Sequence, residues 1–322
     1  MPRELLLLRH GKSDRNSDIE DYDRPLKDKG KRGAQRMAVW LQRNGLTPDL
    51  VISSPAERAL VTAQKCCKAM GMGADHVQTD RRIYQASRDT LLQVLADCPA
   101  EAQRVMLVGH NPGLELLLIY LADQALEIPA KGSLMPTAAL ARLAMPDDWS
   151  ALQEAEAKLL QLIRPSSLEK KFPFPSPHSK ERRDRPAYYY TQSSVIPYRM
   201  VDGRPEILVI RSSQDKHWVI PKGIADPGHN LQNSAAKEAW EEAGVEGDVM
   251  PEAVGNYSYP KWGATCTVNV YPMAVTRQLP EPEWEERHRG RQWVSADKAV
   301  ELLRQPELGP MILALEKWLL KD

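Results

Sequence analysis

Residues 223–245 read GIADPGHNLQNSAAKEAWEEAGV, and this stretch does most to decide the fold of the C-terminal half of the chain. Its Asn and Ser residues can cap the start of a helix, and Gly244 suits the left-handed position that ends one. In that helix Glu238, Glu241 and Glu242 stand at i, i+3 and i+4, so their carboxylates project from one face. Such crowding of acids is unfavourable unless a positive charge neutralises it.

A solvated acidic face is the common alternative interpretation of such a helix. Here, however, the acids cluster at one end of a helix that follows a Gly-bearing loop, and Lys237 can pair with Glu241 but cannot compensate three acids. Hard oxygen ligands on a rigid element, with room left for substrate phosphates, suit Mg²⁺. The stretch therefore predicts a divalent-metal site.

The N-terminal half alternates short apolar runs with amphipathic stretches, which is typical of a parallel sheet with helices on both faces. We expect an α/β fold with a doubly wound, mostly parallel sheet. The expected strands are residues 4–8, 50–53, 105–109 and 138–144, and the expected helices are 29–44, 55–70, 90–96 and 113–122.

The composition changes after residue 163, and β-rich segments follow residue 187. Residues 164–185 hold four prolines, and seven Lys or Arg face three acids, which indicates a stiff, solvated, basic linker. A basic lip that attracts an anionic substrate is the alternative. With no internal repeat, the chain is expected to contain an N-terminal domain over 1–163, a Pro-rich linker over 164–186 and a second domain over 187–322. The second domain should contain strands at 194–201, 206–211, 217–220, 254–259 and 265–275, and helices at 231–243, 296–303 and 310–321.

The bulk composition excludes several classes of protein. Lys plus Arg and Asp plus Glu both number 43, so no global charge favours a nucleic acid polymer or a membrane surface as partner. No stretch approaches the roughly 18 apolar residues of a membrane span, and none resembles a signal peptide. The four cysteines form no C-x-x-C pair, which argues against zinc and disulfide frameworks. These features favour a cytoplasmic protein.

Cation-capable side chains follow three of the expected N-terminal strands. Arg9 and His10 follow the first strand, Arg58 lies just beyond the second, and His110 follows the third. The carboxyl ends of parallel strands line the ligand crevice of such sheets, and each of these positions is close to a helix N-terminus that favours phosphate. A lone His is usually a surface or capping residue, but three strand ends that carry such groups together predict an anion site.

These motifs resemble the histidine phosphatase superfamily, and its short SixA-like branch in particular. The matching pieces are Arg9-His10-Gly11, Arg24-Pro25-Leu26, Ser-Ser-Pro-x-x-Arg ending at Arg58, and Val-Gly-His-Asn-Pro-Gly around His110. The resemblance implies that His10 is the nucleophile and forms a phosphohistidine intermediate. It also implies that Arg9, Arg58 and His110 hold the phosphoryl oxygens, and that this site needs no metal or other cofactor.

One position departs from that pattern. Gln85 stands where many relatives carry a Glu that could donate a proton, and an amide cannot act as a general acid. The pocket would then favour substrates with good leaving groups, such as phosphoramidates or anhydrides. Asp80 or Asp89 could take over the role.

The acidic helix resembles the Nudix box, G-x5-E-x7-R-E-U-x-E-E-x-G-U. The positions in register are Gly223, Glu238, Glu241, Glu242, Gly244 and Val245. His229 replaces the first Glu of the box and Lys237 replaces its Arg, which we expect to tune activity rather than to abolish it. The resemblance implies an α/β/α Nudix sandwich with a mixed sheet, and Mg²⁺ or Mn²⁺ held by the three glutamates.

Flanking residues resemble the branch that hydrolyses diphosphoinositol and diadenosine polyphosphates. In that branch Lys222, Arg211 and Gly223 would bind substrate, and one of the box glutamates, with Glu238 and Glu242 foremost, or else Glu285 or Glu286, would activate water. Tyr257, Tyr259 and Trp262 could stack on a base, although such residues more often serve packing.

The sequence therefore predicts a two-domain phosphohydrolase that acts on a small polyphosphorylated substrate. One site would cut a phosphoanhydride with a metal, and the other would remove a terminal phosphate without one. The alternatives are an N-terminal phosphatase acting on a phosphohistidine protein, and a Nudix module that senses a ligand with degenerate catalysis, as His229, Lys237 and Gln85 suggest.

Overall fold

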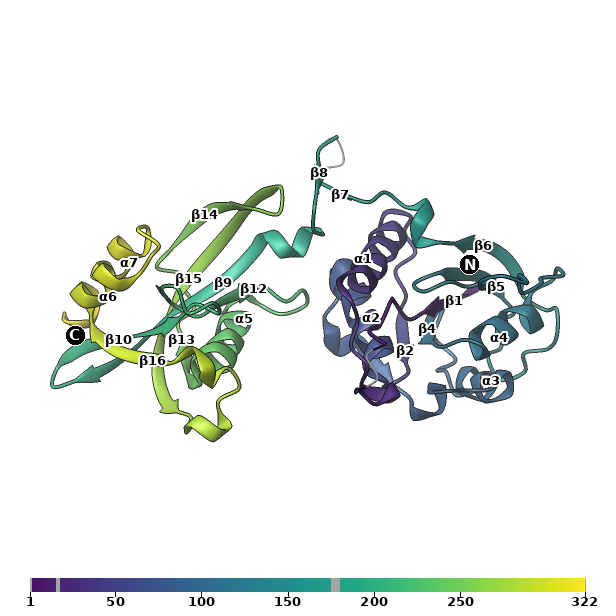
Figure 1. Ribbon diagram of the computed structural model, residues 1–322, viewed down its shortest axis with the longest axis horizontal. Helices are drawn as coiled ribbons and strands as arrows, with labels where there is room; N and C mark the ends of the chain where they lie inside the picture. Colours follow the sequence, from purple (N-terminus) through teal and green to yellow (C-terminus); the bar gives the residue numbers. More distant parts are fainter. Residues whose placement is uncertain (1, 16–17, 175–179, 322) are drawn as a thin grey trace. The chain divides into compact units, whose positions relative to one another are not determined.

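A computed structural model describes residues 2–15, 18–174 and 180–321 of the chain. The chain divides into two compact units, Met1–Pro173 and Phe174–Asp322, and each has its own sheet (Figure 1). The division falls inside the range expected to be the linker, of which residues 175–179 lie outside the described parts. No helix in those described parts is long and apolar enough to cross a lipid bilayer.

The N-terminal sheet is organised around β1 (Arg3–Arg9), which contains four consecutive leucines that are all buried. A strand can bury every side chain only if both faces of its sheet are covered. The sheet order is β3-β2-β4-β1-β5-β6; β1, β2, β3 and β4 run parallel, and β5 pairs antiparallel with β1 on one side and with β6 on the other. The other strands are β2 (Leu50–Ser53), β3 (Val77–Thr79), β4 (Arg104–Gly109), β5 (Leu140–Met145) and β6 (Lys158–Ile163). The expected mostly parallel sheet is confirmed.

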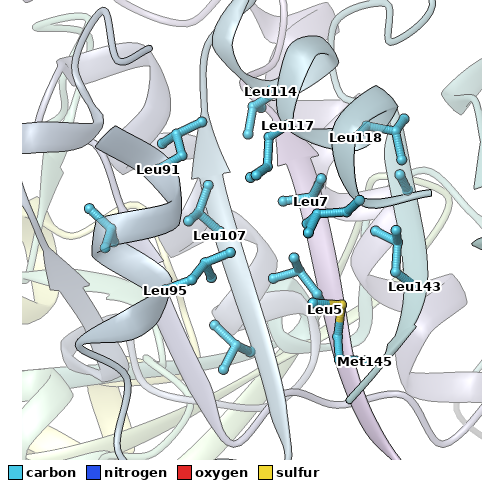
Figure 2. Close-up of a cluster of buried hydrophobic side chains, with 14 of the residues drawn as sticks. Leu5, Leu7, Leu91, Leu95, Leu107, Leu114, Leu117, Leu118, Leu143 and Met145 are labelled. Carbon is cyan, nitrogen blue, oxygen red and sulfur yellow. The ribbon is translucent and has the colours of Figure 1, made fainter. Parts of the chain in front are cut away.

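Helices cover this sheet on both faces. Leu5 and Leu7 point to the face covered by α3 and α4, where they pack with Leu91 and Leu117 (Figure 2). Leu6 and Leu8 face the opposite side, where α1 and α2 pack against each other (Figure 1). The helices are α1 (Asp28–Arg43), α2 (Glu57–Ala69), α3 (Arg88–Ala96) and α4 (Gly113–Leu121). Because β1, β2 and β4 run parallel, their carboxyl ends lie at the same edge of the sheet.

The second unit is built on a mixed sheet of order β11-β10-β9-β15-β13, with β12 and β14 pairing to β9 and β15, and β16 to β10. Strands β9 and β15 are parallel and their other pairings are antiparallel. The long strands are β9 (Thr191–Val201), β10 (Arg204–Arg211), β14 (Gly255–Lys261) and β15 (Ala264–Gln278). The short ones are β11 (Trp218–Val219), β12 (Lys222–Ile224), β13 (Val245–Val249) and β16 (Arg291–Ser295).

Successive side chains along the strands of this sheet point to opposite faces and belong to two separate hydrophobic cores. Val195 and Leu208 pack under α5 (Leu231–Glu238), whereas Ile196 and Ile207 pack under α6 (Ala296–Leu302) and α7 (Leu308–Leu319). This period of two places helices on both faces, which is the expected α/β/α sandwich with a mixed sheet. Two short strands, β7 (Phe172–Pro173) and β8 (Arg182–Arg183), lie in the range expected to be the linker.

The expected helix over 231–243 is not uniform. It is α-helical to Glu238 and continues as a π-turn over Ala239–Ala243, which Gly244 ends with a φ of 60°. The wider turn changes the direction in which the last two glutamates point, because each residue advances by a smaller angle than in an α-helix. A π-turn inside a helix is common at functional sites.

Candidate active sites

His10 lies at the end of β1 and faces His110 from the end of β4, with the two ring centroids 5.1 Å apart. Nδ1 of His10 lies 2.7 Å from the carbonyl oxygen of Gly11. Because a carbonyl can only accept, Nδ1 carries the proton and Nε2 keeps its lone pair. The sheet edge thus presents a neutral imidazole with one nucleophilic nitrogen.

The site keeps both histidines neutral. Burial lowers the pKa of His10 to about 4, and the nearby charges of Arg58, Arg9 and Arg24 act in the same direction against the Gly11 hydrogen bond. Burial and the neighbouring His10 lower the pKa of His110 to about 3. At neutral pH His10 therefore needs no base to free its lone pair.

The loop behind His10 is held by a close approach of backbones. The amide of Gly11 donates to Thr62 Oγ1 at 2.9 Å, and Thr62 in turn donates to the carbonyl of Arg58. A Cβ on Gly11 would lie 2.7 Å from the carbonyl oxygen of Gly30 at the start of α1. Glycine is required here because a side chain would push this loop away from α1.

Buried nitrogen atoms without a hydrogen-bond partner gather around these histidines. Within the described chain they include Nε of Arg9, Arg24 and Arg58, and Nδ1 of His110. Buried polar groups in proteins are almost always satisfied, so such a cluster of unused donors points to a missing acceptor. The Nε2 atom of His110 lies 2.9 Å from the Ser54 hydroxyl, which fixes the ring. An anion with several oxygens fits this set of donors.

The arginines of the site are oriented by two acids. Asp21 binds Nη2 of Arg58 and Nη1 of Arg24, both at 2.9 Å, and accepts a hydrogen bond from the Tyr84 phenol at 2.9 Å. On the other side, Arg9 donates to Ser133 Oγ at 3.0 Å, and Ser133 donates to buried Glu115 at 2.6 Å. Arg9, Arg58, His10 and His110 are thus brought together as expected, and Arg24 joins them.

Neither acid suggested as a substitute for the missing Glu lies in this cluster of contacts. Asp80 binds the guanidinium of Arg82, and exposed Asp89 pairs with Arg88. Gln85 itself is exposed and donates to the Tyr84 hydroxyl at 3.2 Å.

In the second unit, Glu238 packs directly on Gly223. A Cβ on Gly223 would lie 1.8 Å from a Glu238 carboxylate oxygen, so the carboxylate can hold this position only against a glycine. Burial, together with the charges of Glu242 and Glu241, raises the pKa of Glu238 to about 8. A carboxylate held where negative charge is unfavourable indicates that a cation belongs beside it.

The other two glutamates have separate partners. Glu242 accepts a hydrogen bond from the backbone amide of Lys222 at 2.9 Å and forms an ion pair with buried Arg289. Glu241 lies 3.5 Å from Lys237, which also reaches Asp226 at 3.4 Å. His229 is exposed in the loop before α5. Lys237 therefore connects the loop between β12 and α5 to the π-turn, although it cannot bind a carboxylate with two parallel N–H groups as Arg can.

The described residues contain no set of three His, Cys, Asp or Glu side chains already gathered around one point. The donor chemistry nevertheless fits a hard divalent ion, since Glu238, Glu241 and Glu242 offer only oxygen atoms and burial raises the pKa of both Glu238 and Glu242. Arg289 neutralises Glu242 in part. Metal binding would require Glu241 and Glu242 to turn toward Glu238.

A cavity of about 420 Å³ is lined in part by Lys222, whose backbone amide binds Glu242. Lys222 and Tyr259 line it, and the ammonium of Lys222 lies 2.9 Å from the Tyr259 hydroxyl. Tyr257 and Tyr259 are stacked with ring centroids 6.3 Å apart, and both line the cavity. The remaining lining residues are His217, Val219, Ile220, Lys261, Leu303, Arg304, Gln305 and Leu308.

Two residues expected at the substrate site lie apart from this cavity. Arg211 sits over the ring of Trp218 and pairs with Asp215, and it is not part of the cavity lining. Trp262 is also absent from the lining. Glu286 binds Arg289 at 2.8 Å and is connected to the glutamate cluster through it, whereas Glu285 is exposed.

Comparisons with known proteins match each of the two units. The family profile of the histidine phosphatase superfamily (branch 1) matches residues 5–85, and that of the NUDIX domain matches residues 189–315. Nudix hydrolase 16, mitochondrial, of Arabidopsis thaliana is 32% identical over 130 residues, which cover 34% of this chain and 71% of the relative.

Solved structures resemble each unit separately. The protein histidine phosphatase SixA complexed with tungstate is 20% identical and covers 51% of this chain and 97% of its own, with a TM-score of 0.42. An Ap4A hydrolase of C. elegans is 20% identical and covers 41% of this chain and 99% of its own, with a TM-score of 0.37.

The two folds and their sites define a phosphate-processing hydrolase with two domains. The chain belongs to the Nudix hydrolase family through its C-terminal domain, and its N-terminal domain matches the profile of the histidine phosphatase superfamily over residues 5–85.

Several residues of these sites were not assigned a role from the sequence. Asp21, Ser54 and Tyr84 reach the His10 site only because the loops around the sheet edge converge there. Arg24 belongs to the Arg24-Pro25-Leu26 motif, which is the one sequence feature that could have indicated its place in the site. Arg289 is separated from Glu242 by 47 residues, and no local pattern connects the two.

Proposed function

We propose that the chain hydrolyses polyphosphorylated small molecules at two independent sites. The Nudix site would cut a phosphoanhydride bond with a divalent metal, and the His10 site would remove a terminal phosphoryl group through a phosphohistidine intermediate. The observation that carries the second activity is the cluster of buried, unpartnered donors around a neutral His10.

At the N-terminal site, Nε2 of His10 would attack the phosphorus atom while the leaving group departs on the opposite side. Arg9, Arg24, Arg58 and His110 surround the place where the transferred oxygens would lie. Their N–H groups would stabilise the charge of the transition state, which is the main task of a protein in phosphoryl transfer. Water would then attack the phosphohistidine and restore the imidazole.

At the Nudix site, Glu238, Glu241 and Glu242 would hold Mg²⁺ or Mn²⁺. The ion would supply positive charge against the bridging oxygens of the substrate and orient the attacking water. Lys222 lies between Glu242 and the aromatic wall of the cavity, so its ammonium can bind a substrate phosphate. Glu242 or Glu238 would accept the proton of the attacking water.

The cavity favours a nucleoside polyphosphate over a diphosphoinositol. The stacked Tyr257 and Tyr259 offer a flat aromatic surface for a base, and Lys222, Lys261 and Arg304 offer charge for phosphates. A diadenosine polyphosphate combines both features. Its cleavage products would carry the terminal phosphates that the His10 site requires.

Trapping of the intermediate tests the phosphohistidine step. The protein is mixed with a phosphorylated substrate in EDTA, quenched in alkali, digested and analysed by mass spectrometry. The proposal expects a phosphoryl adduct on the peptide that contains His10 and none in a His10→Ala variant. Turnover without an adduct in either protein would contradict the mechanism.

A second candidate function is turnover of a phosphohistidine protein with the Nudix domain as a sensor. The observation in its favour is Arg289, which occupies a carboxylate expected to bind metal. Measured turnover of diadenosine tetraphosphate that is lost in Glu242→Gln would exclude it. Binding of that compound without any turnover would support it.

A further inference from the structure

The His10 site contains one carboxylate that no step above uses. Asp21 belongs to the short turn η1 (Asp21–Asp23) between β1 and α1, and it contacts Arg58, Arg24 and Tyr84 together. Arg58 also donates to the backbone carbonyl of Asp21, so main chain and side chain are both fixed. This carboxylate is therefore a rigid part of the site.

The position of Asp21 relative to His10 suits the departing side of the reaction. His10 lies at the floor of the site, where it is 8% exposed, whereas the side chain of Asp21 is 44% exposed at the rim. Phosphoryl transfer runs in line, with the nucleophile and the leaving group on opposite sides of the phosphorus. An attack from the floor sends the leaving group toward the rim, where Asp21 lies beside the arginines.

Asp21 also lies next to the position where a proton donor is missing. The Tyr84 phenol donates to Asp21 at 2.9 Å and accepts from the amide of Gln85 at 3.2 Å, so one phenol separates the two side chains. The amide of Gln85 cannot act as a general acid, and the hydroxyl proton of Tyr84 is already engaged in the hydrogen bond to Asp21. Asp80 and Asp89 are bound to other arginines.

We propose that Asp21 is the proton donor to the leaving group at the His10 site, a role that rests on the function proposed above. As the bond from phosphorus to the leaving oxygen breaks and the bond to Nε2 of His10 forms, that oxygen takes the proton of the Asp21 carboxyl. In the second step the Asp21 carboxylate takes a proton from water as the water oxygen bonds to phosphorus. The phosphorus–nitrogen bond then breaks and returns its electron pair to Nε2.

The charges around Asp21 explain how it acquires the proton. In the free protein burial acts to raise its pKa, but the Tyr84 hydrogen bond and the charges of Arg58 and Arg24 hold the pKa below its usual value. His110 also faces it and is neutral. A bound phosphoryl group shares these arginines and adds negative charge beside the carboxylate, which favours its protonated form.

The leaving group provides the test. Aryl phosphates are hydrolysed in EDTA by the full chain and by Asp21→Asn, with saturating p-nitrophenyl phosphate, which leaves easily, and phenyl phosphate, which does not. We expect kcat of Asp21→Asn to fall by about 100-fold or more with phenyl phosphate, and far less with p-nitrophenyl phosphate. Asp23→Asn, an exposed acid on the same turn, is the control and should match the unmodified chain with both substrates.

Two further variants separate the ways in which the test could fail. Asp21→Glu keeps a carboxyl group. Even if its kcat falls, the ratio of kcat with p-nitrophenyl phosphate to kcat with phenyl phosphate should stay as small as in the unmodified chain. Equal losses with both substrates in Asp21→Asn would mean that Asp21 only positions the arginines, which overturns the inference while leaving the His10 mechanism intact. Activity of His10→Ala equal to that of the unmodified chain would overturn both.

Discussion

The chemistry of the N-terminal site depends on a histidine that stays neutral in a positively charged pocket. Burial is the largest cause of the lowered pKa of His10, and the arginines add to it. The same arginines provide the donors for a phosphoryl group. A charge arrangement that favours phosphate therefore also keeps His10, the proposed nucleophile, unprotonated.

This arrangement predicts an unusual pH dependence. Because the pKa of His10 is about 4, the imidazole gains a proton, and loses its nucleophilic lone pair, only as the pH falls toward 4. The measurement uses p-nitrophenyl phosphate, whose good leaving group needs little from a proton donor. With EDTA present and the ionisation of the substrate corrected for, kcat/KM should be constant from about pH 8 down to about pH 5 and decline below it. A decline centred near the ordinary histidine value of 6.5 would show that His10 is solvated or is not the nucleophile.

Arg24 is expected to bind the phosphoryl group, although its motif alone did not assign that role. Its Nε is buried without a partner and its charge reaches His10. Loss of one charged hydrogen bond costs about 1.5–3 kcal/mol, so Arg24→Met should lower kcat/KM by roughly 10- to 100-fold. Steady-state kinetics with Arg43→Met, an exposed arginine at the end of α1, provides the matched control. Equal behaviour of the two variants would remove Arg24 from the site.

Helices and strands with a regular hydrophobic periodicity could be predicted from the sequence, whereas elements that depend on pairing with distant parts of the chain could not. The strand β1 and the helix α1 were predicted to within one residue at each end, because four buried leucines and a long amphipathic repeat leave little choice. The edge strand β6 was not predicted, because its partly exposed residues show no strict alternation. Likewise, the π-turn Ala239–Ala243 has no local sequence signature.

The contact between β12 and α5 predicts a steric dependence of metal binding. In Gly223→Ala the new Cβ would overlap the carboxylate of Glu238 and displace it. We expect Mn²⁺ affinity, measured by isothermal titration, to fall by at least about 10-fold, as loss of a supporting contact typically does. Metal-dependent hydrolysis should fall with it.

Gly255→Ala is the control for this steric effect, because its Cβ would meet only the flexible end of Met311. That variant should keep the Mn²⁺ affinity of the unmodified chain. Normal Mn²⁺ binding by Gly223→Ala would mean that Glu238 is not a ligand.

At the scale of the whole molecule, two hydrolytic domains of different chemistry share one chain. The sequence motifs alone identified both families and most of the side chains that lie around His10. They could not show that Arg211 lies outside the cavity or that Arg289 binds Glu242, because both facts depend on how distant strands pack. The sharing of a chain suggests that one domain produces what the other consumes.

Diadenosine tetraphosphate tests this account most directly, because both of its ends are capped and no terminal phosphate exists until the chain is cut. With Mg²⁺, the unmodified chain should release nucleotides and inorganic phosphate. Glu242→Gln should release neither, and His10→Ala should release nucleotides without phosphate. A mixture of the two variants should restore phosphate release. Phosphate released by His10→Ala alone, or nucleotides released by Glu242→Gln alone, would contradict the assignment of the two sites.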